Sequence, residues 1–152
     1  MALKDALHPD RIRILQSNTK EQVLSELIEL LGDPGGIPDK ADLKERILYR
    51  EQLMSTGIGL GIAVPHVRME GVKAPTVAIG ICREGVPDYE SIDDSAVKIV
   101  VMIVAGKDQH REYIRLLAEI VSKLKGERMI EQLLNAESPE EICDFLVGDD
   151  SV

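Results

Sequence analysis

The chain has 152 residues, of which 44% are hydrophobic, 30% are charged and only 3% are aromatic, and its formal net charge is −9. This length and composition are typical of one globular domain with a core of Leu, Ile, Val and Ala, so we expect a single domain over residues 1–152 rather than a disordered chain. The acidic balance argues against nucleic acid as a partner, because proteins that bind it cluster Lys and Arg against the phosphate backbone, and it favours a basic protein partner.

The first third of the chain predicts a short strand and two helices. Residues 12–16 have the apolar content of an edge strand. A helix follows over 19–32, opened by a capping-box pattern that starts at Thr19. After a turn at 33–39, Asp39 is positioned to cap a second helix that runs to about residue 54.

The rest of the chain predicts strands that alternate with helices. A glycine-rich loop leads through an apolar stretch into Pro65 and His66, and the apolar runs 76–82 and 97–105 have the composition of central strands covered on both faces. Three helices are expected after them, from Asp108 as the N-cap to about residue 125, at 127–135 and at 139–147. Helices and strands interleaved in this way predict an α/β layered sheet.

Arg50 is a charged residue on an apolar helical stripe. At about 100° per residue, the second helix places Arg50 in line with Leu43, Ile47 and Met54. A guanidinium directed at a core is costly unless an anion meets it. Three interpretations stay open: Arg50 binds an anionic ligand, forms a structural ion pair with a carboxylate, or extends its stem outward to solvent.

His110 stands in a similar position on the third long helix. The apolar face expected for that helix consists of Tyr113, Ile114, Leu117, Val121 and Leu124. His110 lies in the first turn near the middle of this face, where the helix dipole favours a neutral ring that donates one N–H and also favours a bound anion. A core histidine with satisfied hydrogen bonds is the alternative.

His66 follows an apolar, strand-like segment directly, with Pro65 before it and Arg68 two residues beyond. Loops at strand ends are where α/β folds place ligands, and a neutral imidazole is an effective nucleophile near neutral pH. His66 is therefore either a nucleophile or a surface histidine without a task. The glycines at 57, 59 and 61 do not form a GxGxxG motif, and they allow either the close approach of an anion or a neighbouring strand, or simple turns.

Neither a metal site nor a membrane segment is expected. The three histidines are far apart in the sequence and lack zinc-ligand spacing, and the two cysteines form no CxxC pair. No apolar run approaches the roughly 18 residues of a membrane span, and the N-terminal stretch MALKDALHPD lacks the apolar core of a signal peptide. We expect reduced cysteines, a cytoplasmic location and no direct insertion into a membrane.

Two segments carry a family resemblance. The run REQLMSTGIGLGIAVPH, followed by VR, closely resembles the active-site signature of the fructose/mannitol-type enzyme IIA domains of the bacterial phosphotransferase system. The later segment GVPDYESIDDSAVKIVVMIVAGKDQH, followed by REYIRLLAEI, resembles a second block of that family, in which a histidine opens a helix after a central strand. The similarity covers essentially the whole chain. It implies a three-layer α/β/α fold in which a mixed parallel and antiparallel sheet lies between helices.

The resemblance also implies a function, that of a phosphocarrier in the phosphoenolpyruvate-dependent sugar phosphotransferase system. His66 matches the histidine that accepts a phosphoryl group from the small carrier HPr or a paralogue and passes it to an enzyme IIB, while Arg50 and His110 line the phosphate. Further phosphate contacts are expected from Ser55, Thr56, Gly57 and Arg68. No cofactor or metal is implied, because donor and acceptor are both imidazoles.

Two other functions stay open. Nitrogen-regulatory enzyme IIA proteins share the signature, so the chain is alternatively a regulatory module whose phosphorylation state decides which protein it binds. A non-catalytic interaction domain would require His66 to be incidental. Val67 departs from the family pattern, because relatives usually carry a small residue there, and we expect it to affect access or partner fit without removing a chemical group.

Overall fold

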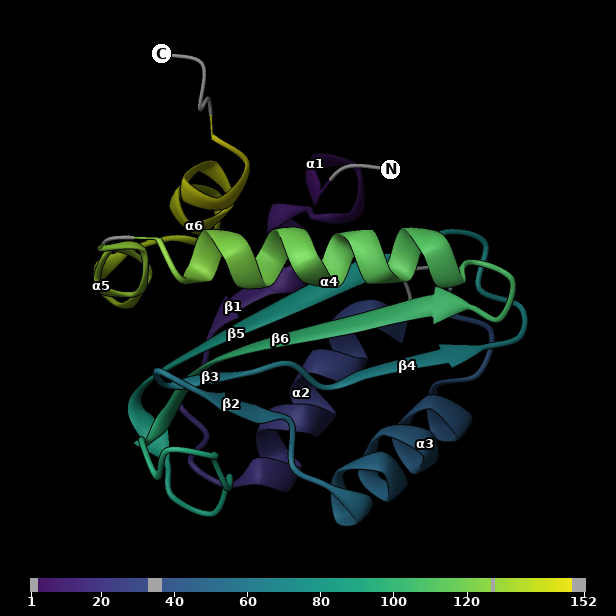
Figure 1. Cartoon of the computed structure of the whole chain (residues 1–152), viewed down its shortest axis with the longest axis horizontal. Coiled ribbons are helices and arrows are strands. Elements are labelled where there is room, and N and C mark those ends of the chain that lie inside the picture. Colours follow the sequence, from purple (N-terminus) through teal and green to yellow (C-terminus); the bar gives the residue numbers. More distant parts are fainter. Residues whose placement is uncertain (1–2, 33–36, 127, 149–152) are drawn as a thin grey trace.

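A computed structural model describes residues 3–32, 37–126 and 128–148 (Figure 1). Its helices are α1 (Leu3–Ala6), α2 (Lys20–Gly32), α3 (Lys40–Leu53), α4 (His110–Leu124), α5 (Met129–Asn135) and α6 (Pro139–Val147), and η1 (Pro9–Arg11) is a 3-10 helix. Its strands are β1 (Ile12–Ile14), β2 (Gly57–Gly59), β3 (Ile62–Ala63), β4 (His66–Met69), β5 (Thr76–Val86) and β6 (Val97–Gly106). The expected edge strand, central strands and long helices are confirmed, whereas no pattern predicted the short α1 and η1. The expected turn at 33–39 lies partly outside the described residues.

The strands form one mixed sheet in the order β1-β5-β6-β3-β2, with β4 also paired to β6. β5 and β6 are antiparallel, β1 runs parallel to β5, and β3 and β4 both run parallel to β6. β3 pairs with the first half of β6 and β4 with the second half, so the chain leaves the sheet after β3 and re-enters it at His66. The mixed sheet expected from the resemblance is confirmed.

Helices cover both faces of this sheet (Figure 1). α2 and α3 pack on one face against alternate residues of β6, namely Val100, Met102 and Val104. The helices α1, α4, α5 and α6 pack on the other face, over Val101, Ile103 and Ala105. The three-layer α/β/α architecture is therefore confirmed. None of the helices in the described ranges is both long and apolar enough to cross a membrane.

β2 and β3 form a tight hairpin where the sequence predicted a loop that leads into one short strand. Gly59, Leu60 and Gly61 turn the chain with φ of 97°, 59° and 79°. The carboxylate of Asp93 accepts a hydrogen bond from the Leu60 N–H at 3.0 Å and holds the turn to the following loop. A Cβ at Gly57 would overlap the carbonyl oxygen of Glu90, so this glycine permits close approach of two backbone segments.

The helix starts show where local signals were correct. Asp39 Oδ1 accepts from the N–H of Asp42 at 3.1 Å, and Thr19 Oγ1 accepts from Gln22 at 3.3 Å, as expected. The prediction that Asp108 caps α4 is wrong, because the N-cap is Gln109, which makes no side-chain cap. The Gln109 Oε1 instead accepts from the Gly106 N–H at 2.6 Å, and this contact moves the start of the helix one residue along.

Two predicted apolar stripes are shifted. Met54 is wrong as a stripe residue, because it is 68% exposed and extended at the C-cap of α3, beyond the point where helical spacing applies. On α4 the buried positions are Tyr113, Leu116, Ile120 and Leu124, while Ile114 is 47% exposed. His110 is exposed, which removes the alternative that it is a core histidine.

Candidate active site

His66 opens β4 at an edge of the sheet. It lies opposite Ile103 in the pairing with β6, so its side chain faces the α4 side of the sheet. The ring Nδ1 lies 2.6 Å from the carbonyl oxygen of Val64. Because a carbonyl oxygen only accepts, Nδ1 carries the proton in the neutral ring and Nε2 keeps a free lone pair. The half-buried ring is thus held with Nδ1 engaged and with Nε2 free of a proton.

The first turn of α4 brings the Tyr113 ring to His66 and places the His110 ring near that of Tyr113. The ring of Tyr113 lies 5.5 Å from that of His66 and 6.5 Å from that of His110, measured between centroids. Tyr113 is 8% exposed and contacts both histidines, while His110 occupies the first position of the helix. Sequence patterns identified Tyr113 as buried but not as a neighbour of the site; its place one helical turn after His110 is the signal that could have found it.

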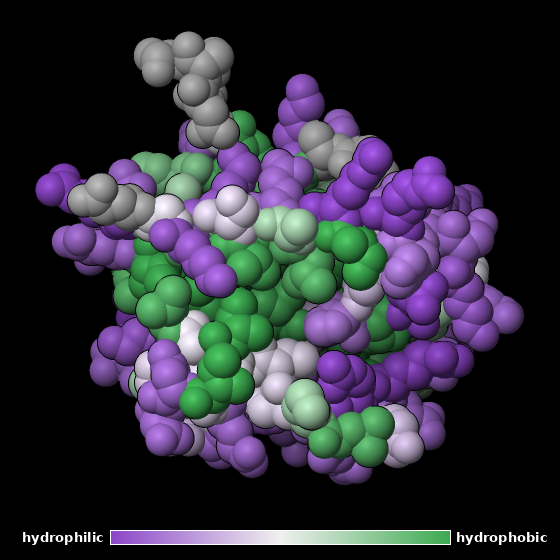
Figure 2. Space-filling view, in the orientation of Figure 1, coloured by the Kyte–Doolittle hydropathy of each residue, from purple (hydrophilic) through white to green (hydrophobic). Residues whose placement is uncertain are grey.

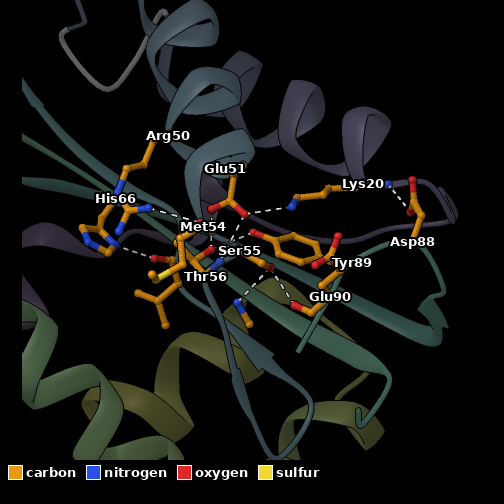
Figure 3. Close-up of polar contacts among 12 residues, drawn as sticks. Lys20, Arg50, Glu51, Met54, Ser55, Thr56, His66, Asp88, Tyr89 and Glu90 are labelled. Carbon is orange, nitrogen blue, oxygen red and sulfur yellow. Dashed lines mark hydrogen bonds and ion pairs between the residues drawn. The ribbon is translucent and has the colours of Figure 1, made fainter. Parts of the chain in front are cut away.

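Arg50 lies in the last turn of α3, and its Nη1 donates to the carbonyl oxygen of Met54 at 3.1 Å. In Figure 3 its side chain extends from the end of α3 toward Met54 and the His66 ring. No carboxylate among the described residues forms an ion pair with it. Of the three interpretations, the structural ion pair is therefore not observed, while the half-exposed guanidinium fits both an anion ligand and extension to solvent.

Glu51, the residue after Arg50, was missed by the sequence analysis. Its side chain is buried and takes the stripe position four residues after Ile47. The carboxylate accepts from the Thr56 hydroxyl at 2.5 Å and from the Thr56 N–H at 3.2 Å (Figure 3). The four-residue spacing from Leu43 to Ile47 to Glu51 is the sequence signal that could have found it, since it places a glutamate in an apolar stripe.

The hydroxyl groups of the segment between α3 and β2 are engaged in hydrogen bonds within the protein. The Ser55 hydroxyl donates to the Glu90 carbonyl at 2.6 Å, and the Gly57 N–H donates to the Ser55 hydroxyl at 3.3 Å. The Thr56 hydroxyl is occupied by Glu51. These bonds hold the loop and give no support to direct phosphate contact by the two hydroxyls.

Arg68 lies two residues after His66 and so on the same face of β4. Its side chain is exposed, and Nη1 donates to the carbonyl oxygen of Lys107 at 3.2 Å, just before α4 begins. The cationic or ring-bearing candidates come from three elements: Arg50 from α3, Arg68 from β4 and His110 from α4. Among the described residues, no group of three or more His, Cys, Asp or Glu is arranged to hold a metal ion.

The fold is a three-layer α/β/α sheet in which His66 begins an edge strand. Comparison with known proteins identifies the class of protein to which this fold belongs. The family model "Phosphoenolpyruvate-dependent sugar phosphotransferase system, EIIA 2" matches residues 5–148, and the chain belongs to this enzyme IIA family. It is 33% identical over 128 residues to the fructose-specific EIIA component of Haloferax volcanii, covering 84% of this chain and 82% of that protein.

Longer and solved relatives agree with this family. The chain is 36% identical over 147 residues to the fructose-specific EIIABC component of Bacillus subtilis, covering 96% of this chain but only 23% of that protein. Nitrogen regulatory protein IIA-Ntr from Neisseria meningitidis superposes with a TM-score of 0.86 at 28% identity, covering 95% of this chain and 98% of that one. Enzyme IIA mannitol of Escherichia coli, solved in complex with phosphorylated enzyme IIB, gives 0.78 at 26% identity, covering 94% and 98%.

Proposed function

We propose that this chain is a phosphocarrier that accepts a phosphoryl group on His66 from a phosphohistidine of HPr or a paralogue and passes it to an enzyme IIB. The observation that carries the proposal is the hydrogen bond from His66 Nδ1 to the Val64 carbonyl, which leaves Nε2 unprotonated. Membership of the enzyme IIA family supports the reaction class, and the named roles of donor and acceptor are inferences from relatives.

The proposed step moves one phosphoryl group between two imidazoles. The Nε2 lone pair of His66 forms a bond to phosphorus while the bond from phosphorus to the donor's ring nitrogen breaks, and that nitrogen keeps the electron pair. The proton on Nδ1 stays in place, so the phosphorylated ring carries positive charge, and the Val64 carbonyl dipole stabilises it. No general base is needed at Nε2, because the attacking atom holds no proton.

The negative charge of the transferred group needs cationic partners. In the proposed complex the Arg50 guanidinium pairs with the equatorial oxygens, which carry the charge of a loose transition state. His110 at the first position of α4 donates an N–H from a helix end that itself favours anions. Arg68 adds positive charge on the same face of β4, while Ser55, Thr56 and Gly57 hold the loop rather than contact the oxygens.

The acceptor is proposed to be an enzyme IIB, and the transfer to take place in the cytoplasm. The solved pairing of enzyme IIA mannitol with phosphorylated enzyme IIB supports a partner of this kind. Apolar side chains that could contact such a partner are exposed near the site, with Met54 at 68% and Ile114 at 47%. In Figure 2 apolar surface extends below α4, over the strands at the front of the sheet.

A second function is favoured by one specific observation. The superposition with IIA-Ntr from Neisseria meningitidis has the higher TM-score of the two solved structures compared above. A regulatory role would use the same phosphorylation of His66, with the charge change deciding which protein binds. The two functions differ in whether an enzyme IIB removes the phosphoryl group.

The test uses the purified chain with phosphoenolpyruvate, enzyme I and HPr. The proposal expects a label that is acid-labile and base-stable, absent from His66→Ala, and chased from the wild type by an enzyme IIB. Label that enters but is not removed by fructose- or mannitol-type enzyme IIB would favour the regulatory function. Label in His66→Ala equal to that in the wild type would overturn the proposal.

A further inference from the structure

A polar cluster, largely buried, holds the segment between α3 and β2. It consists of Lys20, Glu51, Thr56 and Tyr89 and is here called the Glu51 cluster (Figure 3). The Lys20 ammonium lies 3.0 Å from Glu51 Oε1 and 4.3 Å from the centroid of the Tyr89 ring. The Glu51 side chain is 3% exposed and that of Lys20 is 19% exposed, so this ion pair is largely removed from water.

The hydrogen bonds of the Glu51 cluster form a chain that ends at the carboxylate. Thr56 donates its N–H and its hydroxyl to Glu51, and Tyr89 lies 2.9 Å from the same hydroxyl. Burial, together with the charge of Glu51, raises the pKa of Tyr89 far above its ordinary value, so its hydroxyl remains a donor to Thr56. Because the Thr56 hydroxyl donates its hydrogen bond to Glu51, its oxygen can accept one from Tyr89. The cluster therefore has one consistent set of donors and acceptors.

The Glu51 cluster is connected to the reactive ring through two further hydrogen bonds. The carbonyl oxygen of Thr56 accepts from the Val64 N–H at 3.0 Å, and the carbonyl oxygen of Val64 contacts His66 Nδ1 at 2.6 Å. The carbonyl that sets the protonation of the His66 ring is therefore in a segment tied to Thr56. Glu51 also directly follows Arg50, so one buried group anchors both the helix end and the strand entry.

An apolar residue at position 51 would be a simpler choice for stability. Positions 43 and 47 of the same stripe are Leu and Ile. Burying a charge costs desolvation free energy, and attraction to the partner charge offsets only part of that cost. The carboxylate offers something an apolar side chain does not, namely two acceptor oxygens that fix Thr56 in position and direction. This difference points to a task beyond packing.

We propose that Glu51 is a positioning residue for phosphotransfer, which acts through Thr56 and Val64 to keep the His66 ring protonated on Nδ1 and its Nε2 free. The inference rests on the proposed function of His66 as the phosphoacceptor. In a chain without this restraint the Val64 carbonyl can turn away, and the neutral ring then populates the form with the proton on Nε2, which is not nucleophilic at that atom.

Substitutions in the Glu51 cluster test this directly. Thr56→Val removes only the hydroxyl, Thr56→Ser keeps it, and Glu51→Gln removes the charge while keeping the shape. Glu29→Gln is the matched control, because Glu29 pairs with Lys40 at 2.9 Å at an exposed position of α2. Thermal unfolding establishes that each variant is folded. Should Glu51→Gln fail to fold, Thr56→Val and Tyr89→Phe, which each remove one hydroxyl, carry the test.

The primary readout is the ¹⁵N spectrum of the His66 ring, which distinguishes the two neutral forms without any phosphoryl donor. In folded Thr56→Val and Glu51→Gln we expect the share of the Nε2-protonated form to rise at least threefold. The phosphotransfer rate at saturating donor should fall at least threefold, with KM within twofold of the wild type. Thr56→Ser and Glu29→Gln should match the wild type within twofold.

Two results would overturn the inference. One is an unchanged ring spectrum and saturating rate in the folded variants, which would make the Glu51 cluster purely structural. The other is equal impairment of Thr56→Ser and Thr56→Val, since the hydroxyl would then not be the active group. A wild-type chain that takes up no label would refute the phosphocarrier function separately, while the ring spectrum would still test the positioning.

Discussion

Arg50 and Glu51 are neighbours at the end of α3 but occupy opposite environments. The Arg50 guanidinium stays at the surface, where it donates to the Met54 carbonyl at 3.1 Å, whereas the Glu51 carboxylate is buried against Lys20 and Thr56. At the last helical turn, therefore, the Arg50 side chain extends toward the His66 ring (Figure 3), while the buried Glu51 carboxylate holds Thr56. The two charges serve different tasks and should respond differently to substitution.

Arg50→Ala should lower the rate of His66 phosphorylation at least tenfold, which corresponds to about 1.4 kcal/mol of transition-state stabilisation. Folding should be little affected, because the side chain is half-exposed and makes one hydrogen bond. Arg46→Ala is the control: Arg46 lies one turn earlier on α3 and pairs with Asp42 at 2.9 Å. Single-turnover labelling of both variants checks the prediction, and an Arg50→Ala rate equal to that of Arg46→Ala would contradict it.

The fold followed from local patterns more completely than the site did. Strands and helices could be predicted because the spacing of apolar residues and helix caps such as Asp39 are determined by a few neighbouring residues. The site depends on the ends of helices, where helical spacing no longer predicts which way a side chain points. Met54 is extended at the C-cap of α3, and Gln109 rather than Asp108 is the N-cap of α4. Glu51 was missed because Lys20, its ion-pair partner, and Tyr89, which contacts Thr56, are distant from it in sequence, and only the folded chain brings them together.

Phosphorylation should occur on Nε2 of His66 and not on Nδ1. The Nδ1 atom is 2.6 Å from the Val64 carbonyl and has no room for a phosphoryl group while that bond persists. NMR of ¹⁵N-histidine-labelled phosphoprotein locates phosphorus through its coupling to one ring nitrogen. Coupling to Nδ1 would mean that the ring turns before it reacts, and the assignment of the nucleophile would then be wrong.

Asp93 should make the β2–β3 hairpin sensitive to acid. Hydrogen bonds from Ser95 and from the Leu60 N–H hold the pKa of Asp93 well below its usual range. Since the folded-state pKa is depressed, the stabilisation is present in full above the unfolded pKa of about 3.9 and is lost as pH falls from there toward the folded pKa. Asp93→Asn should therefore be less stable than the wild type at neutral pH, and the difference should shrink below about pH 4.

The neighbouring residue supplies the control for this measurement. Asp94 is also exposed and has φ of 60°, a conformation that asparagine tolerates, and its backbone N–H rather than its carboxylate bonds to Ser91. Urea unfolding at neutral pH and at about pH 3 should show a pH-dependent stability gap for Asp93→Asn and none for Asp94→Asn. Equal gaps for the two variants would assign the effect to general charge instead of to the hairpin contacts.

Val67 should affect stability and not phosphotransfer. Although it follows His66 directly, successive strand residues point to opposite faces, and Val67 packs against the layer of α2 and α3. The expectation that its bulk narrows access to the site therefore does not match the direction of the side chain. Val67→Ala removes two half-buried carbons, so we expect a loss of about 1 kcal/mol in the free energy of unfolding and a phosphorylation rate within twofold of the wild type. Urea unfolding and single-turnover labelling separate the two effects. A faster rate with unchanged stability would show that Val67 faces the partner instead.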